Sequence, residues 1–146
     1  MIRFHFTNSF TLKNKRKIKN WLKDTIVNEK KKVGDINYVF CSKQYLKKMN
    51  NDYLSKNYET DVISFDFSKD NKISGDIYIS SETVKKNSII FNVCFNNELK
   101  RVMVHGLLHL LNYNDKSKQE LKIMREKENF YINLNSWFSA NYEYEI

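Results

Sequence analysis

Residues 99–115, LKRVMVHGLLHLLNYND, hold the strongest structural signal in this sequence. Their apolar side chains recur at the i, i+3, i+4, i+7 spacing of a helix with one buried face. The pattern stops at Asn112, a residue type that tolerates the left-handed backbone on which many helices end. We therefore predict a helix that ends near Leu111 and is capped at its start by Asn96 or Asn97. Its apolar stripe consists of Leu99, Val102, Met103, Gly106, Leu107, Leu110 and Leu111.

Two of the three histidines in the chain lie on this helix. His105 and His109 are four residues apart, and a helical turn takes about 3.6 residues, so the two rings project from nearly the same side. Their ring nitrogens can converge on one ion, as in the H-x-x-x-H helices of zinc enzymes. The alternative is a pair of hydrogen-bonded histidines in the core, with no metal between them.

Asp115 is the candidate for a third ligand. On a continuous helix it would lie about 240° from His109, on the wrong side, so the helix has to stop between the two residues. Residues 117–120 (SKQE) match a capping box, which predicts that a second helix starts soon afterwards. The intervening turn can then fold Asp115 back toward the histidines. Two imidazoles, a carboxylate and an open position suit a catalytic zinc; alternatively, Asp115 is an ordinary turn residue that caps the next helix.

Gly106 follows the first histidine, where H-E-x-x-H proteases carry the glutamate that acts as general base. A peptidase would need another base at this site, so the glycine counts against proteolysis. A carboxylate ligand also donates more negative charge than a third imidazole. We therefore expect a metal-bound water to be less acidic here than in an all-histidine site.

The rest of the chain carries strand and helix patterns in turn. Strands are predicted where apolar and polar residues alternate, and a polar turn ending at Gly75 joins two of them into an antiparallel hairpin. The predicted class is α+β (mixed α/β), with a small mixed four-stranded sheet packed against about five helices in one domain, residues 1–146. The predicted strands are 2–6, 36–41, 61–67 and 76–80. The other predicted helices are 12–32, which Gly34 separates from the next strand, 42–51, and one after Ser117 with the stripe Leu121, Met124, Tyr131, Leu134 and Phe138.

Composition limits the partners and the compartment. The formal net charge of +8 favours a polyanionic partner, although the lysine-rich, proline-free composition is also what A/T-rich codons produce. Cys41 and Cys94 lack metal-site or redox spacing, so we expect two buried, reduced thiols. Without a signal-like N-terminus or an apolar stretch of about 18 residues, we expect a cytoplasmic protein with no membrane partner. The sequence does not define an oligomeric state.

Three ordered motifs resemble those of the YbeY endoribonucleases. Residues 105–115 (HGLLHLLNYND) resemble the family's H-G-x-L-H-L-x-G-Y-D-H signature. Residues 50–53 (NNDY) and 60–65 (TDVISF) resemble its N-x-x-Y…T-[DN]-V-L-S-F block, and residues 75–77 (GDI) resemble its G-D-I strand. The order of the predicted elements agrees as well, so the resemblance covers nearly the whole chain.

The resemblance implies a single-strand-specific, metal-dependent endoribonuclease that acts in rRNA maturation, at the 3′ end of the small-subunit rRNA, and in ribosome quality control. Its partners would be single-stranded RNA and the ribosome or its small subunit. One Zn²⁺ per chain would be held by His105, His109 and Asp115, with His105 as a catalytic residue and a metal-bound water as nucleophile. Asp115 stands where the family has a third histidine, and Asn112 replaces a glycine.

Four further residues are candidates for substrate binding: Lys56, Arg101, Tyr53 and Asp61. Many family members carry an arginine important for RNA cleavage where this chain has Leu54, and Lys56 can replace its charge but not its bidentate geometry. Arg101 can contact a phosphate or belong to a solvated helix face. Tyr53 can stack on an unpaired base or belong to the core. Asp61 can border the metal cleft or, as we favour, satisfy backbone groups.

Two alternative functions stay open on the sequence. Leu54 and Asp115 are compatible with a ribosome-associated assembly factor that keeps the metal site but cleaves RNA weakly or not at all. Two histidines and a carboxylate are also the triad of non-haem iron oxygenases. That triad usually sits in a β-barrel, and this chain has too few predicted strands for one.

Overall fold

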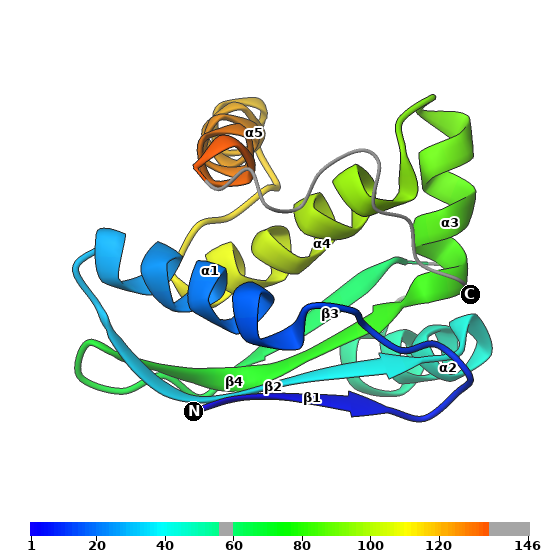
Figure 1. Ribbon diagram of the computed structural model, residues 1–146, viewed down its shortest axis with the longest axis horizontal. Helices are drawn as coiled ribbons and strands as arrows, with labels where there is room; N and C mark the ends of the chain where they lie inside the picture. Colours follow the sequence, from blue (N-terminus) through cyan, green and yellow to red (C-terminus); the bar gives the residue numbers. More distant parts are fainter. Residues whose placement is uncertain (56–59, 135–146) are drawn as a thin grey trace.

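The computed structural model describes residues 1–55 and 60–134, arranged as a sheet with helices packed on it (Figure 1). The sheet order is β1-β2-β4-β3. Three strands, β1 (Ile2–Phe6), β2 (Lys32–Cys41) and β4 (Lys72–Ser80), run parallel, and β3 (Val62–Asp66) pairs antiparallel with β4. The helices are α1 (Lys15–Asn28), α2 (Lys43–Leu54), α3 (Ser81–Ile90), α4 (Phe95–Leu110) and α5 (Lys118–Asn133). The predicted α+β class and its mixed four-stranded sheet are confirmed, and β3 and β4 form the predicted antiparallel hairpin. β4 begins at Lys72 and not at Asp76, so Gly75 lies within the strand instead of ending the turn.

The helices form layers on the sheet. α1 and α4 lie on one face, and α5 lies beyond them, away from the sheet (Figure 1). One hydrophobic core joins these three helices to the strands. The indole of Trp21 donates to the main-chain carbonyl of Tyr131 (2.8 Å), which ties α1 to α5. A smaller cluster, in which Leu46 meets Ile63, attaches α2 to the other side of the sheet.

Gly106 allows α4 to approach the sheet closely. A Cβ at this position would lie 2.7 Å from Cγ2 of Ile77 and 3.2 Å from Oγ of Ser64. The Ser64 hydroxyl donates to the main-chain carbonyl of Gly106 (3.0 Å), which fixes α4 against β3. The position that carries a glutamate in H-E-x-x-H proteases therefore has no room for a side chain in this fold.

The first helix and the second strand begin at other residues than predicted. The chain enters α1 through a left-handed Asn14, so the helix begins at Lys15 and not at Leu12, which is nevertheless buried. β2 passes through Gly34 instead of starting at Ile36. The register between β2 and β4 shifts there, and a side chain at residue 34 would meet β4, so the glycine belongs to the strand and does not separate it from the helix.

The start of α4 and the whole of α3 also differ from the prediction. Sγ of Cys94 accepts a hydrogen bond from the main-chain N–H of Asn97 (3.4 Å), so Cys94 caps α4 and the predicted Asn96 and Asn97 caps are wrong. Cys41 is buried as predicted, whereas Cys94 is partly exposed, and both are free thiols. The sequence pattern does not predict α3, because the apolar residues at its end are exposed and form no buried stripe.

The predicted stripe of the last helix is confirmed in part. Met124 and Tyr131 are buried, but Leu121 and Leu134 are exposed, so the buried face of α5 is narrower than the apolar pattern indicates. Phe138 lies outside the described residues. Each helix in the described ranges is too short or too polar to cross a lipid bilayer.

We expect Gly106→Ala to destabilise the fold. Helix propensity alone would favour alanine by about 1 kcal/mol. The new methyl group would instead collide with the buried Ile77 side chain, and overpacking a core costs about 1–3 kcal/mol. The free energy of unfolding, measured by urea titration, should therefore fall. Lys122→Ala on the exposed surface of α5 is the control; a Gly106→Ala protein at least as stable as this control would contradict the close packing.

Candidate metal centre

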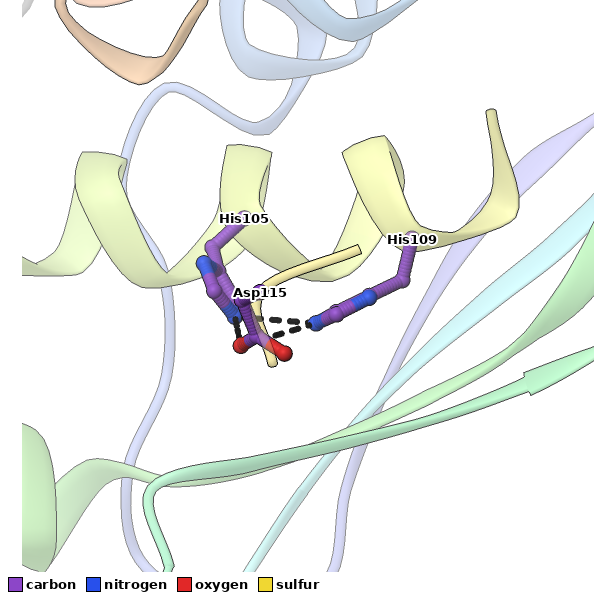
Figure 2. A group of neighbouring side chains, drawn as sticks. All are labelled: His105, His109 and Asp115. Atoms are coloured by element: carbon purple, nitrogen blue, oxygen red, sulfur yellow. Dashed lines mark hydrogen bonds and ion pairs between the residues drawn. The ribbon is translucent and has the colours of Figure 1, made fainter. Parts of the chain in front are cut away.

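His105 and His109 lie one turn apart on α4 and direct their rings toward Asp115 (Figure 2). Their Nε2 atoms are 3.0 Å apart. Oδ2 of Asp115 lies 3.2 Å from Nε2 of His105 and 3.5 Å from Nε2 of His109. One potential ligand atom from each residue falls within 4.8 Å of the other two. Imidazole nitrogens and a carboxylate oxygen are ligand atoms that zinc accepts, so this group could hold a metal ion.

The end of α4 returns the third side chain to the histidines. Asn112 has a φ of 71°, in the left-handed region, which confirms the predicted helix end. Its N–H donates to the carbonyl of His109 (3.1 Å), and the N–H of Tyr113 donates to the carbonyl of Leu108 (3.0 Å). These two bonds form a Schellman motif, which ends a helix and reverses the chain. The predicted capping box at Ser117 is also present, so the turn between α4 and α5 is short.

A buried carboxylate on α5 orients the first histidine. Glu128 has no exposed surface, and its Oε2 lies 2.6 Å from Nδ1 of His105. The guanidinium groups of Arg101 (2.7 Å) and Arg125 (2.7 and 2.9 Å) donate to the same carboxylate. Burial raises the pKa of Glu128, but the hydrogen bonds from His105 and the arginines outweigh burial and hold the pKa below its ordinary value. The ionised carboxylate therefore accepts from Nδ1 and leaves the lone pair of His105 on Nε2, toward Asp115.

His109 is held in the state that a metal ligand requires. Burial, and then the proximity of His105, lower the pKa of His109, although Asp115 acts in the opposite direction. A lowered pKa keeps the imidazole neutral near pH 7. Only the neutral ring has a nitrogen lone pair to give to a metal ion.

Glu128 is a site residue that the sequence pattern alone does not identify. The residue stands four positions after Met124 and three before Tyr131, and both of these side chains are buried. A glutamate on the buried face of a helix has to find a partner, because an unpaired buried charge is costly. That signal is present in the sequence. The identity of the partner is not, because His105 belongs to another helix.

A cleft of about 850 Å³ opens beside the three side chains. Its walls come from β3 and the two residues before it, from the end of α3, and from α4 and α5. Ligand sites in proteins typically have volumes of roughly 300–1,000 Å³, so the group that could hold a metal stands at the wall of a cleft of ligand-binding size. The charged residues that line the cleft are Asp61, Asp66, Glu98, Arg101, Asp115, Lys116 and Arg125, and His105 and His109 line it with them.

Two of the predicted substrate residues, Arg101 and Asp61, line this cleft. Arg101 does not form a solvated helix face, because its guanidinium binds Glu128 and also Oδ1 of Asn129 (2.8 Å). The side chain of Asp61 accepts from Nδ2 of Asn87 (3.3 Å), and it also accepts from a main-chain N–H, as we favoured. Burial raises the pKa of Asp61. The structure therefore places both residues at the cleft, while their contact with substrate stays a prediction.

Of the other two candidates, the structure describes only Tyr53. Tyr53 is 71% exposed, so it is not a core tyrosine, and its ring meets Phe65 edge-on with the ring centres 6.2 Å apart. It is not among the described residues that line the cleft. Lys56 lies outside the described residues. Leu54 lines the cleft, so the departure from the family's arginine falls at this cleft.

Glu98 is a second residue that the sequence analysis missed. It lines the cleft and is only 5% exposed. Among the described residues, its carboxyl group accepts no hydrogen bond and forms no ion pair. Burial, and then the nearby Asp61, raise the pKa of Glu98 to about 7, against the opposing effect of Arg101 and Arg125. The sequence signal is its spacing: seven residues before His105, it falls on the same side of the helix.

Comparison with known proteins finds relatives along most of the chain. The family model for Endoribonuclease YbeY matches residues 4–135. Relatives of that name include proteins from Flavobacterium johnsoniae (48% identical, covering 88% of this chain and 92% of the relative) and Christiangramia forsetii (44% identical, 87% and 89%). Another comes from Karelsulcia muelleri (43% identical, 90% and 94%). The solution structure of TM1509 from Thermotoga maritima is similar with a TM-score of 0.63 at 27% identity, covering 91% of this chain and 87% of that one.

We expect Glu128→Gln to weaken binding of a metal ion at the candidate site, with Zn²⁺ as the probe, about 10–100-fold, the usual cost of losing the carboxylate behind a ligating histidine. The amide keeps the shape of the side chain but removes the charge that raises the basicity of His105. Competition between metal-free protein and a chromophoric chelator measures the affinity. Glu126→Gln, an exposed glutamate on the same helix, is the matched control. Equal zinc affinities for wild type, Glu126→Gln and Glu128→Gln would refute the orienting role.

Proposed function

Because this chain belongs to the endoribonuclease YbeY family, we propose that it is a metal-dependent endoribonuclease that hydrolyses phosphodiester bonds in single-stranded RNA. The observation that carries the proposal is the convergence of His105, His109 and Asp115 at the wall of one cleft. A metal-dependent nuclease needs a metal site beside a space that admits a nucleic-acid strand. The group that could hold a metal stands at the wall of such a cleft, which supports the proposal.

The three side chains would hold one divalent ion, and we propose Zn²⁺. Two ring nitrogens and one carboxylate oxygen fit this ion and match the protein ligands of catalytic zinc sites. When bound, the ion would supply Lewis acidity to a phosphate oxygen and to the attacking water. Glu128 supports this chemistry through His105, because it keeps the proton on Nδ1 and so leaves Nε2 as the ligand atom.

The RNA backbone would contact the cations that line the cleft. Arg125 is the best placed, because its side chain is 52% exposed and comes from the helix that carries Glu128. Its Nη1 binds Glu128, and in the described part of the chain the rest of its guanidinium makes no hydrogen bond. Lys116 lines the cleft next to Asp115. Arginine and lysine contacts to phosphate position a strand without reading its sequence.

The substrate that we propose is ribosomal RNA, bound on the ribosome or its small subunit in the cytoplasm. The reaction would mature the 3′ end of the small-subunit rRNA and serve ribosome quality control. The net charge of +8 supports a polyanionic partner. Tyr53, which is exposed, would stack on an unpaired base, and Lys56 would add a cation near the position of Leu54.

Neither alternative function gains support. The relatives that match most of this chain carry the name endoribonuclease, which favours the enzyme over an inactive assembly factor. The iron oxygenase triad usually sits in a barrel, whereas this sheet is open, with β1 and β3 as its edges.

We expect His109→Ala to lower the rate of RNA cleavage at least about 100-fold, because the Lewis acidity of a metal ion contributes several kcal/mol to lowering the barrier. Initial rates on an unstructured, fluorescently labelled RNA measure the loss. The matched control is His5→Ala on β1, whose ring binds Oδ1 of Asn37 (2.9 Å) away from the cleft. Removing metal from the wild type with a chelator should reproduce the loss. Equal cleavage by wild type and His109→Ala, or full activity in chelator, would reject the proposal.

A further inference from the structure

We propose that the part of the cleft lined by Phe91, Val93 and Glu98, which we call its α3 end, is a subsite for one unpaired nucleobase that carries an exocyclic amino group. The Glu98 carboxyl group would accept a hydrogen bond from that amino group. The inference rests on the proposed function, because the base would belong to RNA bound beside the metal group. The subsite would recognise one base of that RNA by a hydrogen bond, at a part of the cleft separate from the candidate metal group.

Glu98 is a nearly buried acid whose carboxyl group faces the cleft without a protein partner in the described residues. The residue is only 5% exposed, and among the described residues its carboxyl group has neither a hydrogen bond nor an ion pair. Burying a polar group without a partner is unfavourable. The side chain lines the cleft, so a molecule in the cleft can provide the missing hydrogen bond. Glu128 shows the contrast, because it is fully buried but has three hydrogen-bonding partners.

The neighbours of Glu98 favour a neutral ligand over an ion. Asp61 is close enough to raise the pKa of Glu98, so two carboxyl groups face this part of the cleft and disfavour a phosphate. A metal ion is disfavoured as well, because within the described residues the only cluster of ligand atoms suited to one is at His105, His109 and Asp115. In the described part of the chain, Arg101 and Arg125 form no ion pair with Glu98, because each binds Glu128 through its Nη1 atom.

The other lining residues suit a flat ring. Phe91 and Val93 line this end and are 59% and 38% exposed, so they offer apolar surface to a ligand. Unpaired bases in RNA are recognised by stacking on such side chains and by hydrogen bonds at their edges. A carboxyl oxygen can accept from the amino group of cytosine, adenine or guanine, whereas uracil lacks an amino group and offers only its ring N3–H.

Glu98 and the candidate metal group lie along the same side of α4. The seven residues from Glu98 to His105 span about 10 Å of helix. A base held at Glu98 would therefore lie in the same cleft as the bond that would be cleaved at the metal group. Glu98 would select the substrate without touching the reacting atoms.

The test is base preference in mononucleotide binding. Metal-free wild type is titrated with CMP, AMP, GMP and UMP while amide NMR shifts are followed. We expect the three amino-bearing nucleotides to bind about tenfold more tightly than UMP, because the proposed hydrogen bond comes from an exocyclic amino group, which UMP lacks. Equal affinities for all four, or no saturable binding of any, would overturn the subsite.

Three variants assign the preference to Glu98. Glu98→Met removes the acceptor at similar volume and should bring the four dissociation constants within about twofold of one another. Glu98→Gln keeps a carbonyl acceptor and should keep part of the preference. Asp24→Asn changes an exposed acid on α1 outside the cleft and should behave as wild type. A preference that survives unchanged in Glu98→Met would overturn the proposal.

Thermal unfolding separates binding from a structural role. Because Glu98 has no partner among the described residues, the melting temperature of Glu98→Met should not fall below that of the wild type, and a fall would assign the residue to the fold and overturn the proposal. Mononucleotide binding needs neither metal nor cleavage. If the protein discriminates between bases but cleaves no RNA, the subsite is supported and the proposed function is rejected. If it cleaves RNA but binds all four nucleotides equally, only the subsite is rejected.

Discussion

The left-handed backbone at Asn112 ends α4 and turns the chain back past the last turns of that helix. A continuing helix would carry Asp115 to the side opposite His109. The same two hydrogen bonds that satisfy the last carbonyls of α4 therefore also complete the group of two imidazoles and a carboxylate. The chemical type of the proposed third ligand, a carboxylate where the resemblance implies a histidine, does not alter this requirement, because either side chain has to be delivered by the same reversal.

The helix that follows this turn, α5, orients the His105 ring of the candidate metal group. α5 packs against α4 through its buried face, and that face also carries the Glu128 carboxylate to His105. A buried carboxylate is tolerated because an imidazole and two guanidinium groups surround it. The packing of α5 against α4 therefore also orients the His105 ring. Glu98 differs in kind, since it is buried at the same cleft and the described part of the fold gives it no partner.

Local patterns in the sequence predict much of this structure. Alternation of apolar residues predicts the strands, and the spacing around His105 and His109, with Asn112 and the SKQE cap, predicts the turn that returns Asp115. These features depend on residues within a few positions of one another, so sequence periodicity and turn chemistry suffice.

What the sequence does not predict depends on contacts between distant segments. The role of Glu128 exists only because α5 docks on α4, and Gly106 is needed only because β3 and β4 lie beneath it. The sequence does not predict α3, because a helix is recognised by apolar residues on one buried face, and Ile89 and Ile90 of α3 are exposed. Glu98 resembles any polar helix residue until the cleft beside it is known.

X-ray absorption at the zinc edge, on protein loaded with one equivalent of Zn²⁺, tests the central claim most directly. The account predicts only nitrogen and oxygen ligands, at about 2.0–2.2 Å, with the outer-shell scattering of two imidazoles. Asp115→Ala should keep the imidazole signal and lose one protein oxygen. A sulfur ligand at about 2.3 Å, or a spectrum without imidazole scattering, would place the metal elsewhere and contradict the account.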